Sequence, residues 1–143
     1  MKAGAEPSNE ALELARKGFD HFNAGELEAF YALQHPEIVL VPADLWPERG
    51  TFTGIDAFKR FLSQFLDAFS TVRFEHVREP EVIGELALFR GHWSGAGATT
   101  GIQADSVDFS VVFSARDGLI DHARFFVSDE EARLFAAEHQ ARA

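Results

Sequence analysis

One carboxylate and one histidine in the second half of the chain have the chemistry of an acid–base pair. Asp105 has the same parity as Val107 and Phe109, so a regular strand places its carboxylate on their apolar face. A buried carboxyl without a partner has a raised pKa and can act as a base or as a neutral donor. His92 is its candidate partner. A bulge after Gly101, or a frayed strand end, instead leaves Asp105 in water, where most Asp side chains lie.

The sequence does not determine on which face of the strand His92 lies. It has the parity of Leu88 and Arg90, whereas the alternate residues of the same segment, Phe89 and Trp93, form the more apolar set. His92 is therefore either part of a reactive site or a hydrogen-bonded histidine on a sheet face. A second neighbouring pair, 121–122, is Asp followed by His, and a regular strand points them to opposite faces.

The remaining residue types exclude several other chemistries. None of the 6 His residues has HxH or HExxH spacing, so the sequence predicts no metal site and no cofactor. The segment GHWSG at 91–95 has Ser in the fourth place and is not a nucleophile elbow. The absence of Cys excludes disulfides and thiolate ligands. A formal charge of -10 repels phosphate backbones, so we expect no nucleic-acid partner.

Hydrophobic spacing and capping residues predict four helices to position these groups. The helical patterns cover residues 8–22, 27–31, 53–69 and 128–138. Ser8 is the candidate N-cap of the first helix. The third has one face of Phe side chains and begins with a capping box of Thr53 and Asp56. The fourth begins with a second capping box, Ser128 with Glu131.

The other segments predict strands joined by tight turns. Strand patterns occupy residues 38–41, 72–77, 86–94, 102–115 and 119–127. Residues 84–85 and 117–118 are typical of two-residue hairpin turns. This order indicates an α+β domain whose helices cover one face of a curved antiparallel sheet. The strand over 86–94 is apolar on both faces, so we expect a second subunit to cover the other face.

Three separated stretches resemble one protein family. They are FNAGEL at 22–27, GTFTGIDAF at 50–58, and RDGLI at 116–120 followed by VSDEEA at 127–132. In this order they resemble the SnoaL-like branch of the nuclear transport factor 2-like superfamily. The resemblance implies a single cone-shaped α+β domain over residues 8–138, with flexible termini at 1–7 and 139–143. In such a cone the strongly curved sheet wraps around a long helix and encloses an apolar pocket.

The superfamily includes ketosteroid isomerases, limonene epoxide hydrolases and polyketide cyclases, which differ in the polar residues of the pocket. The resemblance places Pro42 where an isomerase-like base would stand, with Asp44 two residues further on. Gly18 takes the place of the isomerase-like oxyanion-hole tyrosine. Phe125 takes that of the inward carboxylate of the cyclases and hydrolases, and the hydrolase-like Arg and Asp pair around 92–94 is absent. The acid–base groups of these enzymes are therefore not kept.

We therefore expect a SnoaL-like protein of unassigned activity that binds a small, largely apolar molecule in the cone. The alternative is an isomerase, hydrolase or cyclase that uses Asp105, with or without His92, in an arrangement different from that of the family. A third class is a dimeric interaction module whose cone is filled by its own Phe side chains. A pocket of roughly 300 Å³ or more separates the first class from the third.

In a ligand-binding cone, Asp105 and His92 are the expected polar groups, and the expected walls are Tyr31, Trp46, Phe109 and Phe125. Tyr31 and Trp46 can also offer donors from an otherwise apolar wall. For Tyr31 the sequence favours core packing over this role, and Trp46, in a Pro-flanked loop, can cover the pocket. We further expect a homodimer formed through the outer sheet face. No run reaches the ~20 apolar residues of a membrane helix and no secretory signal is evident, so we expect a cytoplasmic protein without membrane contact.

Overall fold

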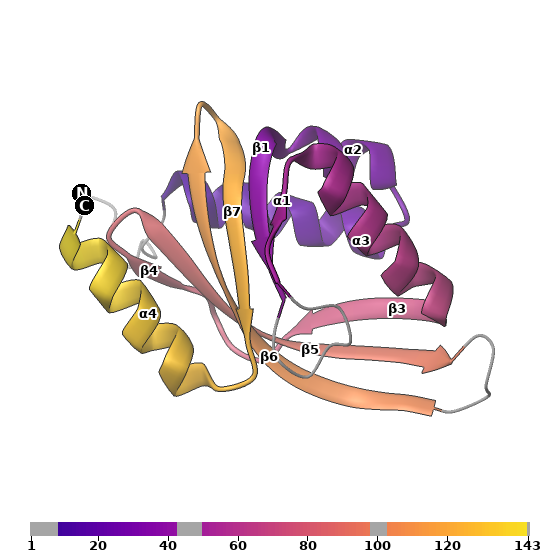
Figure 1. Ribbon diagram of the computed structural model, residues 1–143. Coiled ribbons are helices and arrows are strands. Elements are labelled where there is room, and N and C mark those ends of the chain that lie inside the picture. Colours follow the sequence, from indigo (N-terminus) through magenta and orange to yellow (C-terminus); the bar gives the residue numbers. More distant parts are fainter. Residues whose placement is uncertain (1–8, 43–49, 98–102, 143) are drawn as a thin grey trace, which may run out of the picture.

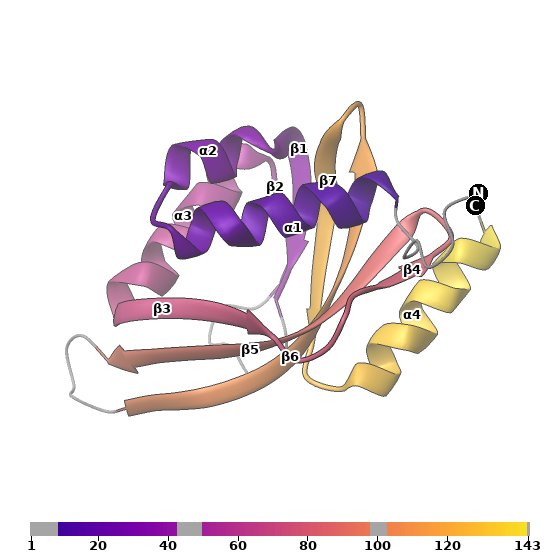
Figure 2. The same ribbon diagram turned by 180° about the vertical axis from the view of Figure 1, so that it is seen from behind.

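A computed structural model of the chain describes the backbone of residues 9–42, 50–97 and 103–142. Within these ranges it describes all side chains except those of 65–72, 93–97, 103–107 and 140–142. A strongly curved sheet forms the centre, with three helices on one face and the last helix on the other (Figures 1 and 2). The expected α+β cone is therefore confirmed.

The helices begin and end close to their predicted positions. They are α1 (Glu10–Asn23), α2 (Leu27–Ala32), α3 (Ile55–Ala68) and α4 (Asp129–Arg142). The N-cap of α1 is Asn9, one residue after the expected Ser8, and its side chain accepts a hydrogen bond from the Leu12 N–H at 2.8 Å. At α4 the Glu131 N–H donates to Ser128 Oγ at 3.1 Å, as the capping box predicts. This helix continues beyond the expected end near residue 138.

The start of α3 differs from the prediction. Thr53 pairs with Val39 in a short strand, so the helix begins only after Gly54. Gly54 has a φ of 95°, a left-handed conformation that glycine adopts at little cost. The strand pairing, which periodicity does not reveal, moves the first turn of α3 along the chain.

The described residues form a seven-stranded sheet. Its strands are β1 (Gln34–Val41), β2 (Phe52–Thr53), β3 (Phe69–His76), β4 (Glu81–Ile83), β5 (Leu86–Gly97), β6 (Gln103–Arg116) and β7 (Leu119–Phe126). The order is β2-β1-β7-β6-β5-β3, and β4 also pairs with β5. Neighbours are antiparallel except β1 and β7, which run parallel. No hairpin joins β1 to β7, so the chain does not impose an antiparallel direction on this pair.

Both predicted hairpin turns are present. Ile83 pairs with Leu86, which leaves Gly84 and Glu85 as the turn, and Gly84 has a φ of 63°. In the second turn Asp117 and Gly118 have φ values of 58° and 76°. Two consecutive left-handed residues match the twist of the flanking strands, which is why such turns are favoured in hairpins.

Alternation along β5 and β6 divides their residues between two hydrophobic cores. Phe89 and Phe109 belong to the core on the side of α1, whereas Leu88 and Val112 belong to a second core on the side of α4. The Phe89 set therefore faces the interior of the cone. Since His92 has the parity of Leu88, the strand places it on the outer face.

The outer core is closed by the chain itself. Ala132 and Ala136 of α4 are fully buried against Leu88 and Val112. The expected second subunit was inferred from the apolar strand around Phe89 and Trp93. Phe89 faces the interior of the cone, and Leu88 on the outer face is covered by the terminal helix. A homodimer remains a proposal, and it has to use another part of the outer face.

A network of charges holds the first turn of α4 on the sheet. Asp129 accepts hydrogen bonds from Arg78 at 2.9 Å, Ser110 at 2.7 Å and Arg133 at 3.1 Å. Burial opposes the ionisation of Asp129, but these hydrogen bonds outweigh it and hold its pKa far below the ordinary value. The carboxylate therefore stays charged at every physiological pH.

Two irregularities in the sheet break the regular alternation. The register of β6 and β7 shifts between the Ser114–His122 and Ala115–Ile120 pairs. The shift brings Asp121 to Ser114, whose Oγ donates to Asp121 Oδ1 at 2.5 Å. The expectation that Asp121 and His122 point to opposite faces is wrong because it assumed a regular strand.

The second irregularity lies in the pairing of β5 and β6. Trp93 pairs with Val107, but Gly95 pairs with Ala104, so β6 has one more residue than β5 in this interval. Asp105 lies within it. Parity counted from Phe109 therefore does not extend to Asp105, as expected when a bulge inserts a residue.

In the described part of the chain, no helix has the length and apolar character needed to span a bilayer.

Candidate functional site

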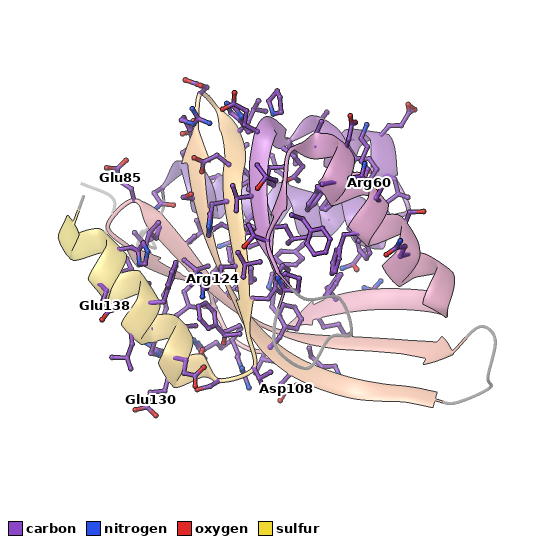
Figure 3. All side chains as sticks on the ribbon, viewed as in Figure 1. Arg60, Glu85, Asp108, Arg124, Glu130 and Glu138 are labelled. Atoms are coloured by element: carbon purple, nitrogen blue, oxygen red, sulfur yellow. The ribbon has the colours of Figure 1, made fainter. Side chains whose placement is uncertain are left out.

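A cavity of about 80 Å³ lies between α1, α3 and the inner face of the sheet. Helix α2 and strands β1, β3, β6 and β7 also contribute lining residues. Eight of the sixteen described lining residues are phenylalanine, so the walls are almost entirely apolar and bulky. Figure 3 shows side chains filling the space between α3 and the sheet, while Arg124 lies on the side of β7 that faces α4.

The phenylalanine rings of the lining contact one another. Phe74 lies beside Phe22 and Phe19, with ring centroids 5.0 and 5.8 Å apart. Phe30 stacks on Phe58 at 6.0 Å and meets Phe22 edge to face at 5.6 Å. Such arrangements add about 0.5–1.5 kcal/mol per pair beyond the burial of area. The cavity is thus framed by a connected set of rings from four elements.

One polar side chain is present among the described lining residues. Gln34, the first residue of β1, is only 9% exposed. Its Nε2 donates to the carbonyl oxygen of Phe30 at 3.0 Å. The bond links the end of α2 to the start of β1 and fixes which way the amide points.

The structure separates His92 from this cavity. Its Nδ1 lies 2.8 Å from Asp108 Oδ1, its cross-strand neighbour on β6. Asp108 is exposed and lies on the side of β6 away from α3 (Figure 3). His92 is not among the lining residues, and the pair has the arrangement of a hydrogen-bonded histidine on a sheet face.

The predicted wall residues have different positions. Phe125 lines the cavity. Phe109 is 2% exposed and lies behind it, with its ring 5.6 Å from that of Phe125. Tyr31 packs edge-on against Phe58 at 6.1 Å, with Lys59 Nζ 5.2 Å from its ring centre. Trp46 and the Asp105 side chain are outside the described residues.

Tyr31, unlike Phe125, does not line the cavity but packs behind residues that do. It is partly exposed, and burial raises the pKa of its phenol. It contacts the outer sides of two lining rings, Phe30 and Phe58. Its hydroxyl is therefore not one of the polar groups that the described lining presents to the cavity.

Periodicity alone did not single out Gln34. The predicted helix ended near residue 31 and the predicted strand began at Ile38, so Gln34 fell between the two. In the structure β1 begins earlier, and Gln34 pairs with Ile120 of β7. An isolated amide between a helix rich in aromatics and a buried strand is the signal that could have identified it.

The positions used by related enzymes can be placed around the cavity. Gly18 and Phe125 line it, and Pro42 is buried. The described lining contains no ionisable side chain, and no group of three His, Asp or Glu residues in the described part of the chain could hold a metal ion. The described walls therefore suit binding better than acid–base chemistry.

Comparison with known proteins agrees with this arrangement. No curated protein matches the chain. Among solved structures, a protein from Sinorhizobium meliloti, whose assignment as a polyketide cyclase is itself a proposal, is 21% identical, with a TM-score of 0.64 over 87% of this chain and 99% of that one. An NTF2-like protein of unknown function from Burkholderia pseudomallei is 19% identical, with a TM-score of 0.72 over 88% and 95%.

A third solved structure is that of TerC co-crystallised with polyporic acid. It is 20% identical, with a TM-score of 0.70 over 91% of this chain and 99% of that chain. These likenesses concern the fold. The family itself is given by a sequence model, that of the SnoaL-like domain, which matches residues 15–123. With its order of elements, its curved sheet and this match, the chain belongs to the SnoaL-like domain family.

Proposed function

We propose that this protein binds a small, largely apolar molecule in the cavity of the cone. The observation that carries the proposal is a cavity framed by eight phenylalanines and one amide. A concave apolar site with few polar groups is the usual form of a small-molecule site. A solved relative in fold was co-crystallised with polyporic acid, which supports the use of this fold for holding an organic molecule.

The volume sets the size of the ligand. About 80 Å³ is well below the roughly 300 Å³ of common ligand pockets. It is also below the roughly 150 Å³ of an engineered apolar cavity that holds benzene. The bound molecule is therefore no larger than about one ring, and its entry requires phenylalanine side chains to rotate outward.

The same volume also bears on the interaction module, the third class expected from the sequence. The volume of about 80 Å³ lies below the roughly 300 Å³ that separates the two classes. With its rings in these positions the cone therefore resembles the filled class, and a ligand requires the rings to move. Binding of a ring-sized probe is therefore the measurement that separates a small-molecule site from a filled cone.

An enzyme of the isomerase, hydrolase or cyclase kind is the alternative proposal. Two solved structures whose assignment as polyketide cyclases is itself a proposal support it at the level of the fold. It requires Asp105 to supply the carboxylate, because the described lining has none. A pKa of Asp105 well above the ~3.9 of a free Asp, measured by NMR, would favour this alternative.

The proposed function is tested with fluorobenzene as a probe, by its ¹⁹F NMR line width and shift. Ala123→Leu adds volume inside the cavity, since Ala123 is buried in its wall. Ala137→Leu makes the same change on the exposed side of α4. We expect saturable binding to the wild type and to Ala137→Leu, and at least tenfold weaker binding to Ala123→Leu.

Thermal unfolding of each variant checks that it is folded. Ala15→Leu, which fills the same cavity from α1, replaces Ala123→Leu if that variant does not fold. Absence of saturable binding to the wild type, or equal binding to folded wild type and folded cavity-filling variant, would overturn the proposal.

A further inference from the structure

The side-chain nitrogen of Gln34 has a hydrogen-bond partner, whereas its side-chain oxygen has none among the described residues. Its Nε2 donates to the Phe30 carbonyl at 3.0 Å. This bond determines the orientation of the amide, because turning it over would set two oxygens against each other. The side-chain oxygen Oε1 then receives no hydrogen bond from the described part of the chain.

The side-chain oxygen can accept a hydrogen bond from a molecule in the cavity. Gln34 is 9% exposed and lines the cavity, and its Oε1 is not among the fully buried side-chain atoms that lack a partner in the described part of the chain. A small molecule can therefore reach this oxygen. Most polar groups inside proteins have a hydrogen-bond partner, so a donor in the cavity would complete the bonding of the amide.

Water is a poor candidate for that donor. A buried water is typically held by about three hydrogen bonds, and Gln34 is the one polar side chain in the described lining. A water beside Oε1 would therefore be surrounded mainly by phenylalanine rings. An organic molecule can donate one hydrogen bond and bury the rest of its surface against those rings.

The lining also restricts the charge of the occupant. No described lining side chain is ionisable, so a charged ligand would lose its hydration without gaining a counter-ion. The net charge of -10 further disfavours anions. A neutral molecule with a hydroxyl or N–H group fits both constraints.

We propose that Gln34 selects the ligand: its Oε1 accepts a hydrogen bond from the hydroxyl or N–H of a neutral, single-ring alcohol, phenol or amine whose ring lies among the phenylalanines. This inference rests on the proposed function. Phe30 acts as a positioning residue, because its carbonyl oxygen holds the Nε2 side of the amide and so directs Oε1.

The test compares two probes of nearly equal size, 4-fluorophenol and 4-fluorotoluene. The first carries a hydroxyl where the second carries a methyl group. Their affinities for the wild type and for Gln34→Met, which keeps the length of the side chain but has no amide, are measured by ¹⁹F NMR titration. Circular dichroism and thermal unfolding show that the variant is folded.

One hydrogen bond changes affinity by up to about tenfold. We expect the ratio of 4-fluorophenol affinity to 4-fluorotoluene affinity to be about tenfold higher in the wild type than in Gln34→Met. An equal ratio in both proteins overturns the role of Gln34 while leaving the proposed function intact. Binding of neither probe to the wild type overturns the proposed function itself.

The wild type alone also decides the question if Gln34→Met does not fold. The hydroxyl of 4-fluorophenol is better hydrated than a methyl group, so an apolar pocket without an acceptor prefers 4-fluorotoluene. Binding of 4-fluorophenol at least as tightly as 4-fluorotoluene supports the proposal. Weaker binding of 4-fluorophenol contradicts it.

Discussion

The side chain of Asn23, the last residue of α1, takes the place of a neighbouring strand beside Phe74 of β3. Its Nδ2 donates to the Phe74 carbonyl at 2.7 Å, and its Oδ1 accepts from the Phe74 N–H at 3.0 Å. One amide thus satisfies both backbone groups of a residue on the free side of an edge strand. The same contact ties α1 to the sheet beside the cavity.

Replacing Asn23 by Ala is expected to destabilise the protein by about 1–3 kcal/mol, because two partly buried backbone groups lose their partner. Urea unfolding followed by circular dichroism measures the change. Lys17→Ala, on the exposed face of the same helix, is the control and should change stability by less than about 0.5 kcal/mol. Equal stability of the two variants would mean that water replaces the Asn23 side chain without loss.

A pair of glycine substitutions should have opposite effects. A Cβ at Gly91 would lie 2.8 Å from Cζ of Phe109 and 3.4 Å from the Glu75 carbonyl oxygen. Phe109 is fully packed, so Gly91→Ala should destabilise by about 1–3 kcal/mol. A Cβ at Gly18 meets no atom closer than 3.7 Å.

Gly18→Ala should therefore stabilise α1 by about 0.5–1 kcal/mol, the usual difference between the two residues in a helix. Thermal unfolding of both variants measures the contrast. A larger loss of stability for Gly18→Ala than for Gly91→Ala would show that the packing around these two residues differs from that described.

The depressed pKa of Asp129 gives stability a dependence on acid pH. The folded pKa lies below the unfolded value of about 3.8, so the contribution is complete above that value and decreases as pH falls toward the folded pKa. Asp129→Asn should lower stability at pH 7 by about 1–3 kcal/mol and reduce the loss between pH 5 and pH 2. Urea unfolding across this range gives both quantities, and a parallel pH profile for the wild type and the variant would refute the assignment.

His122 should titrate below its ordinary value. Burial lowers its pKa most, the charges of Arg124 and His139 lower it further, and Asp121 opposes them. Its ring stacks on Phe135 of α4 at 6.4 Å. Because the unfolded chain then binds a proton more readily, stability falls as pH decreases through about 6.5.

The ¹H–¹³C NMR signals of the imidazole follow this titration directly. A midpoint for His122 below 6.5 is expected, and His122→Gln should make stability less sensitive to pH between 7 and 5. His76, whose pKa burial also lowers, contributes in the same direction and is substituted separately as His76→Gln. A His122 midpoint at or above 6.5 would contradict the burial described.

A homodimer is proposed for the part of the outer face that carries His92 and Asp108, since α4 already covers Leu88. Sedimentation should then give twice the chain mass of 15.9 kDa. Asp108→Lys should shift the equilibrium toward the monomer, whereas Glu138→Lys, the same charge change on α4, should not. A single-chain mass that is unchanged on dilution at tens of micromolar excludes the dimer.

The sequence predicted the elements better than the site. Periods of two and of three to four residues, together with capping and turn residues, are local properties, and they placed the helices and both hairpins within a few residues. Register shifts are set by pairing between distant segments. For that reason the alternation of side chains between the two faces predicted the wrong face for Asp121. It also could not be extended from Phe109 to Asp105.

What covers the outer face of the sheet also could not be predicted from local sequence patterns. From the sequence alone, the helices were expected to cover one face of the strand over 86–94 and a second subunit the other face. The terminal helix covers Leu88 because Ser110 and Arg78 hold Asp129 at the start of that helix. These contacts join segments far apart in the chain. Gln34 could be identified only from the structure, in which the end of α2 and the start of β1 line the same cavity.

The short outer strand β2 has a consequence for how the molecule meets others. One edge of the described sheet ends in two residues, Phe52 and Thr53, and the opposite edge is occupied at Phe74 by a side chain. Long unpaired edges recruit strands from other chains and lead to aggregation. At Phe74 the backbone N–H and C=O are already bonded to Asn23, so a strand from another copy cannot pair with β3 continuously through this residue.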